Sequence, residues 1–142
     1  MRLATALGCA VNGGIFFAFS SFVMPAINTL GPEKATAAMN AMNVAAVRPA
    51  FMTVLFGTAA LTVATGVIGV RQRDPLLIAG SAAFLVGAIG TTIGVNVPLN
   101  DALAAGTTTW ADFYQRWMVA NHVRALSGIA AAALVGAAAV RS

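Results

Sequence analysis

The chain has 142 residues, of which 59% are hydrophobic and only 8% are charged. An ordinary soluble domain carries about 25% charged residues, so this composition excludes that class and predicts a membrane protein with a single domain, residues 1–142. The eight basic residues are scattered along the chain, which argues against a nucleic-acid partner despite the net charge of +4. One cysteine and one histidine cannot form a conventional Cys/His zinc site or bis-histidine haem ligation, so no metal site is expected.

Long apolar segments predict an all-α fold, a four-transmembrane-helix bundle, because about 20 apolar residues suffice to cross a bilayer. The expected spans are residues 3–30, 50–70, 76–97 and 118–140. The first span begins after Arg2 like a signal peptide, but it is longer than a signal peptide's apolar region of about 7 to 15 residues and is expected to be retained. Within it Asn12, Phe16 and Ser20 recur at every fourth residue, so this face should point inward.

Short interfacial helices are expected in the first and third loops. Residues 33–47 are too few and too polar to span, and residues 110–116 carry the aromatic and charged side chains typical of the headgroup level. Pro98 is expected to end the third span. Four spans place both termini on one side of the membrane, and the positive-inside rule favours the cytoplasm if Arg48 and Arg124 are counted as buried in the bundle.

Small residues on the third span provide the clearest helix-packing signal. They alternate at spacings of three and four, which lets another helix backbone approach closely: Gly80, Ala83, Gly87, Gly90 and Gly94. The neighbour is either another helix of this chain or a helix of another chain. Cys9 is expected to be a small packing residue, because no nearby signal would activate its thiol.

Two polar groups are expected to meet at one membrane interface. The first is Asn96, Asn100 and Asp101 at the end of the third span. The second is a helical stripe with spacings of four, three, four and three: Trp110, Tyr114, Trp117, Asn121 and Arg124. We expect Asp101 to pair with Arg124 or Arg48 through charge-assisted hydrogen bonds. Singly, each residue also fits a structural role as a helix cap, an interfacial aromatic or a snorkelling arginine.

His122 is the natural proton acceptor or donor of the chain, because histidine changes its charge near neutral pH. It lies about 100° around the helix from Asn121, away from the centre of the stripe. A role as an interfacial hydrogen-bonding residue therefore stays open beside the catalytic one.

Four blocks of sequence resemble the anthrone oxygenase-like family of small integral membrane proteins, many of which are known only as a domain of unknown function. The blocks are GGIFFAFSSFVMPAI at residues 13–27, RPAFM at 48–52, NVPLNDAL at 96–103 and W-x-x-FYQRW-x-x-x-NHVR at 110–124. NVPLND and WxxxNHVR are the most specific of them. The resemblance extends over nearly the whole chain.

The resemblance implies a four-span bundle and, for the named branch of the family, oxidation of an anthrone to an anthraquinone without a bound cofactor. Asp101 and His122 are then the expected catalytic residues. The expected substrate-binding residues are Arg48, Asn96, Asn100, Trp110, Tyr114, Trp117, Asn121 and Arg124. The expected partners are the lipid bilayer and a hydrophobic planar small molecule, with a homo-oligomer as a further candidate. The alternative function is a non-enzymatic scaffold that packs through its glycine-rich third span.

Overall fold

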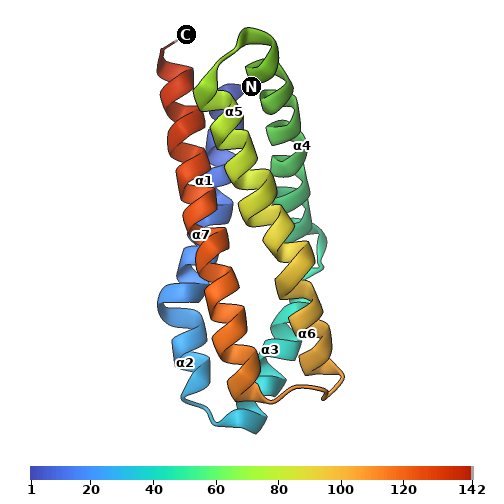
Figure 1. Cartoon of the computed structure of the whole chain (residues 1–142). Coiled ribbons are helices and arrows are strands. Elements are labelled where there is room, and N and C mark those ends of the chain that lie inside the picture. Colours follow the sequence, from blue (N-terminus) through green and yellow to red (C-terminus); the bar gives the residue numbers. More distant parts are fainter. Residues whose placement is uncertain (142) are drawn as a thin grey trace.

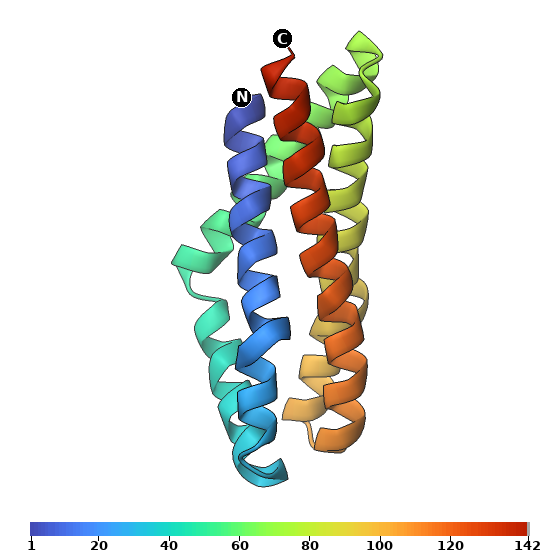
Figure 2. The same ribbon diagram turned by 90° about the vertical axis from the view of Figure 1, so that its left-hand side faces the viewer.

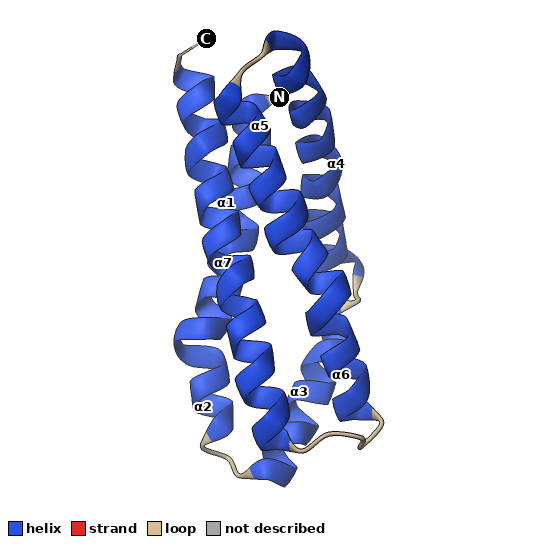
Figure 3. Ribbon diagram, in the orientation of Figure 1, coloured by secondary structure: helices blue, strands red, loops and turns tan. Residues whose placement is uncertain are grey.

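Four helices in this structure are long and apolar enough to cross a membrane: Arg2–Asn28, Pro49–Gln72, Pro75–Ala104 and Trp110–Val140. The computed structural model describes residues 1–141, which form helices and loops but no strand (Figure 3). Both ends of the chain lie at the same end of the bundle (Figure 1). The expected helical bundle of a multi-pass membrane protein is therefore confirmed, and the side of the membrane on which the termini lie stays a prediction.

The first and third spans are interrupted by π-helical segments. The first span consists of α1 (Arg2–Ala18), η1 (Phe19–Val23) and α2 (Met24–Asn28). The third consists of α5 (Pro75–Ala82), η2 (Ala83–Gly90), η3 (Thr92–Asn96) and α6 (Val97–Ala104). A π-helical segment directly precedes the turn that contains Pro25 or Pro98, where the ring removes one backbone donor. Pro98 therefore does not end the third span, which continues to Ala104.

The last span, α7 (Trp110–Val140), begins eight residues before the expected start at residue 118. The Thr109 side chain caps it by accepting a hydrogen bond from the Asp112 backbone N–H at 3.2 Å. Residues 110–116, expected as a separate interfacial helix in the third loop, are thus the first turns of α7. A capping threonine outweighs the change in composition that suggested a break.

The first loop does contain a helix, α3 (Pro32–Ala46), but it packs against α2, α6 and α7 and buries Ala35 and Met39. It therefore belongs to the bundle as well as to the loop. In Figure 2, α3 occupies the half of the bundle away from the termini, and α4 (Pro49–Gln72) runs from there to the terminus end. The two helices are separated at Arg48, whose backbone is extended (ψ 155°), because a residue before proline avoids the helical conformation.

A polar seam joins α1 to α4. Three hydrogen-bonded pairs form it: Thr5 with Thr65 at 2.9 Å between hydroxyl oxygens, Cys9 with Thr62 at 3.8 Å, and Asn12 with Thr58 at 3.1 Å. The paired residues are three or four positions apart on each helix, and their numbers rise along α1 while they fall along α4, so the two helices are antiparallel. Such side chains hold helices together inside lipid. Asn12 and Phe16 are buried and Ser20 is half-buried, so the inward face expected for the first span is confirmed.

The tightest helix contact is between α1 and α7, where two glycines meet. A Cβ added to Gly128 would lie 2.8 Å from the Gly13 Cα. On the third span Gly80 and Gly87 also face α7, whereas Gly94 has no neighbour within 4 Å. The expected glycine contact on the third span is thus confirmed for its first half, and it is made within the chain.

We predict that Gly128→Ala lowers the free energy of unfolding by about 1 to 3 kcal/mol, because the added methyl group would overpack this crossing. Thermal unfolding of the purified protein in detergent measures the change. Gly14→Ala is the matched control, since no atom lies within 4 Å of its added Cβ. It should be neutral or stabilising by up to about 1 kcal/mol, the helix-propensity advantage of alanine. Equal effects of the two changes would contradict the tight crossing.

Candidate active site

A cavity of about 540 Å³ lies inside the half of the bundle away from the termini. Small-molecule sites typically measure about 300 to 1,000 Å³. Most of its wall is aromatic or aliphatic: Phe16, Phe19, Met39, Met42, Phe51, Met52, Leu55 and Trp117. Its polar lining is confined to a few residues: Asn43, Thr92, Asn96, Asn100, Asp101 and Arg124. The balance suits a largely apolar ligand with a few polar groups.

Local sequence explains how the wall forms. The break at Arg48 and Pro49 ends α3 beside the cavity, and the first turns of α4 add Phe51, Met52 and Leu55 to the wall. On the opposite side Thr92, Asn96 and Asn100 follow one another at a spacing of four, so one face of η3 and α6 carries all three into the cavity.

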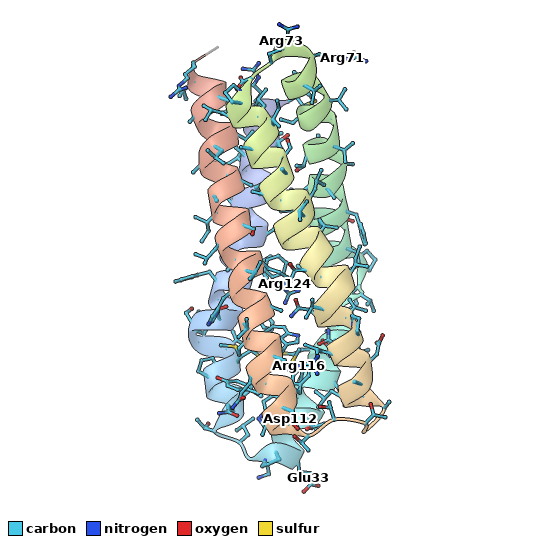
Figure 4. The ribbon with its side chains drawn as sticks, viewed as in Figure 1. Glu33, Arg71, Arg73, Asp112, Arg116 and Arg124 are labelled. Atoms are coloured by element: carbon cyan, nitrogen blue, oxygen red, sulfur yellow. The ribbon has the colours of Figure 1, made fainter. Side chains whose placement is uncertain are left out.

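Arg124 is the only charged side chain that is buried among residues 1–141, with 7% of its surface exposed. One guanidinium nitrogen, Nη2, donates to Asn121 Oδ1 at 2.7 Å, and Nη1 donates to Thr92 Oγ1 at 3.4 Å. The guanidinium carbon lies 4.4 Å from the centre of the Phe16 ring and 5.0 Å from that of Trp117. Figure 4 shows Arg124 about midway along the bundle. Both of its hydrogen-bond acceptors are neutral.

Asn121 is fully buried and holds Arg124 in place. Its amide nitrogen donates to the Phe16 carbonyl at 2.7 Å and to Ser20 Oγ at 2.8 Å, which turns its oxygen toward the guanidinium. Ser20 Oγ is also 2.7 Å from His122 Nδ1. A chain of hydrogen bonds thus runs from exposed His122 through Ser20 and Asn121 to Arg124.

The two other asparagines of the cavity are joined to Trp117. Asn100 Oδ1 accepts a hydrogen bond from the indole N–H at 2.9 Å. Asn96 is 1% exposed, and its amide nitrogen donates to the Trp117 carbonyl at 3.4 Å. Asn96 Oδ1 has no hydrogen-bond partner among the described residues, and neither does Arg124 Nε. Two residues that line the cavity therefore each keep one unpaired buried polar atom, an acceptor on Asn96 and a donor on Arg124.

The expected pair of Asp101 with Arg124 is not formed, although both residues line the cavity. Arg124 bonds to Thr92, and Asp101 lies nine residues further along the same span, a rise of roughly 13 Å in a helix. Asp101 is exposed, so it marks the edge of the cavity and Arg124 its interior. Arg48 is exposed at the start of α4 and does not line the cavity.

Only part of the expected aromatic stripe reaches the cavity. Trp117 lines it, whereas Trp110 and Tyr114 pack against each other with ring centres 5.9 Å apart, and the Trp110 indole N–H donates to Asn28 Oδ1 at 2.7 Å. His122 also lies outside the wall. The sequence reasoning missed Thr92 and Phe51. Thr92 could have been found from its spacing of four to Asn96, and Phe51 from its place in the RPAFM block.

No three His, Cys, Asp or Glu side chains gather within residues 1–141 where they could hold a metal ion. The side chains that line the cavity include a carboxylate at its edge, amides along one wall and a cation in its interior. Such a set can remove a proton from a ligand and stabilise a negative charge on it.

We predict that Asn121→Ala destabilises the protein by about 1 to 3 kcal/mol, because it leaves a buried cation without its shortest hydrogen bond. His122→Ala is the control on the neighbouring position. It removes only the exposed end of the same chain and should change stability by less than about 0.5 kcal/mol. Thermal unfolding in one detergent measures both. A loss of stability with His122→Ala as large as that with Asn121→Ala would contradict the conclusion that Asn121 is the residue that holds Arg124.

Comparison with known proteins identifies the family to which the chain belongs. The family model of anthrone oxygenase matches residues 48–134, from the start of α4 into the last part of α7. The match includes every cavity residue on the second, third and fourth spans, but not the block at residues 13–27 or those on α3. No curated protein and no solved structure matches the chain. Because the match covers more than half of the sequence, the chain belongs to the anthrone oxygenase family.

Proposed function

We propose that this protein oxidises a planar phenolic or anthrone-like substrate, which it takes from the lipid and holds in the cavity without a bound cofactor. One observation carries the proposal. A cavity with a mostly aromatic and aliphatic wall contains a buried arginine with an unused donor and has a carboxylate at its edge. Family membership supports the same class of reaction, although a shared fold alone does not assign a substrate.

Asp101 is the proposed base. It lies at the exposed edge of the cavity, where water can accept the proton that it takes from the substrate. An anthrone carries acidic hydrogens on a carbon that is conjugated with its carbonyl group, so removing one gives an anion whose charge lies largely on oxygen. In this proposal the substrate extends inward, and its oxygen faces Arg124, which stabilises that charge.

Asn96 also lines the cavity, and in this proposal its Oδ1, which has no partner among residues 1–141, accepts a hydrogen bond from a substrate hydroxyl. Phe16, Phe51 and Trp117 supply flat apolar surfaces for the rings. The electron-rich anion then reacts with dioxygen. In the complete reaction the methylene carbon loses two hydrogens and gains one oxygen atom, and the second oxygen atom leaves as water.

His122, the other expected catalytic residue, has a different role in this proposal. It is exposed, lies outside the cavity wall and contacts Ser20. It therefore acts as a positioning residue, which keeps Ser20 and Asn121 oriented so that the Asn121 oxygen faces Arg124. Its replacement should raise KM more than it lowers kcat, because substrate binding depends on the place of the guanidinium.

The alternative, a non-enzymatic scaffold, accounts for less of the structure. A scaffold needs a filled interior and a glycine face that points outward. Here the interior is hollow, and Gly80 and Gly87 contact α7 of the same chain. Gly90 and Gly94, which meet no other helix, are the part of the third span that fits the scaffold.

We predict that the purified protein in lipid nanodiscs consumes oxygen when anthrone is added, and that Asp101→Asn slows this turnover by about 100- to 10,000-fold, the usual range for loss of a general base. An oxygen electrode measures the rate. Asp112→Asn is the matched control, because Asp112 is exposed at the start of α7 and does not line the cavity. Its rate should equal that of the wild type. Absence of oxygen uptake with anthrone and related phenolic carbon acids would overturn the proposal.

A further inference from the structure

Arg124 is a buried cation without a counter-ion among the described residues. Its two hydrogen-bond partners are an amide and a hydroxyl, and the carboxylate nearest to it in the cavity wall, Asp101, lies roughly 13 Å along the span from Thr92. A buried charge is costly unless it is paired. In an apolar span such a residue usually marks a ligand or ion site.

The unused polar atoms point to the same place. Arg124 Nε has no partner, and the bond from Nη1 to Thr92 is long at 3.4 Å, so the guanidinium keeps donors for a further acceptor. Arginine binds oxyanions through two parallel N–H donors, which makes it the residue best suited to such a group. The rings of Phe16 and Trp117 flank the same guanidinium, so an oxyanion bound there lies beside aromatic surfaces.

We infer that the cavity selects a ligand that is an anion in its bound state, a lipophilic aromatic acid whose charged oxygen pairs with Arg124. The acid arrives from the membrane in its neutral form, and its proton leaves through the exposed edge of the cavity at Asp101. The bound anion and the guanidinium then cancel each other's charge. An aromatic ligand is favoured over a fatty acid because four rings line the wall: Phe16, Phe19, Phe51 and Trp117.

This inference deepens the proposed function by naming the charge and the chemical class of the bound ligand before it meets dioxygen. It rests on that function only for the location of the site. Binding of an unreactive probe tests it without turnover, so failure of the oxidation and failure of the charge preference are separate results.

The test compares two probes of one shape, anthracene-2-carboxylate and anthracene-2-methanol, which differ in charge. Fluorescence anisotropy measures their binding to the full chain in zwitterionic nanodiscs, with empty nanodiscs as the blank. The carboxylate should bind at least roughly ten-fold more tightly, the effect of a charge-assisted hydrogen bond in a dry site. Palmitate distinguishes a lipid source of the anion, and it should displace the carboxylate probe only weakly.

Two variants show whether the charge of Arg124 causes the preference for the carboxylate probe. Arg124→Gln should abolish the preference for the carboxylate and leave binding of the alcohol within roughly two-fold of wild type. Asn121→Asp supplies an internal counter-ion, because the Asn121 oxygen already lies 2.7 Å from Nη2, and it should abolish the preference with arginine still present. Arg116→Gln, an exposed change on the same helix, should keep the preference.

Stability gives a readout independent of binding. Without ligand, Arg124→Gln should unfold at a temperature no lower than the wild type does, since it removes an unpaired buried charge. The inference is overturned if the alcohol binds as tightly as the carboxylate, or if Arg124→Gln keeps the preference. It is also overturned if that variant loses stability and binds both probes equally poorly, because Arg124 would then be a structural support. Strong displacement by palmitate would replace the aromatic acid by a lipid one.

Discussion

The structure depends on how a bundle of apolar helices accommodates one buried cation. Arg124 lies about midway along the bundle (Figure 4), fourteen residues into α7, which is roughly 20 Å from its start. An interfacial arginine could extend its side chain to water, but one at this depth needs partners inside the protein. Asn121, Thr92 and two aromatic rings provide them only in part. Arg124 therefore lines the cavity with part of its hydrogen-bonding capacity unused.

The two halves of the bundle are packed differently. In the half near the termini, the Gly13 and Gly128 contact brings α1 close to α7, and the polar seam joins α1 to α4. In the other half, α3 ends before Arg48, the third span contains π-helical segments, and large side chains line a hollow. Tight packing in one half thus supports the open space in the other, where a ligand can bind.

The polar residues of the cavity are arranged along its length. Asp101 lies at the exposed edge, Asn100 and Asn96 follow along one wall through their bonds to Trp117, and Arg124 lies inside. A base that reaches water and a cation that does not are suited to opposite tasks. The first exchanges a proton with solvent, and the second holds a negative charge in a site of low dielectric constant, where electrostatic interactions are strong.

Composition and hydropathy alone determined that four long helices would form. An apolar run of that length lies in the lipid, and there a helix pairs its backbone N–H and C=O groups within the segment. They also indicated the polar residues near Asn96 and Asn121, since such side chains are rare in apolar spans. Tertiary structure decided which of them meet. The spacing of residues along the sequence does not show that Pro98 lies inside a continuing helix or that Trp110 bonds to Asn28. Nor does it show that Asp101 and Arg124 lie at different depths. These outcomes depend on contacts between residues far apart in the sequence, such as the hydrogen bond from Asn121 to Phe16, which lie 105 residues apart.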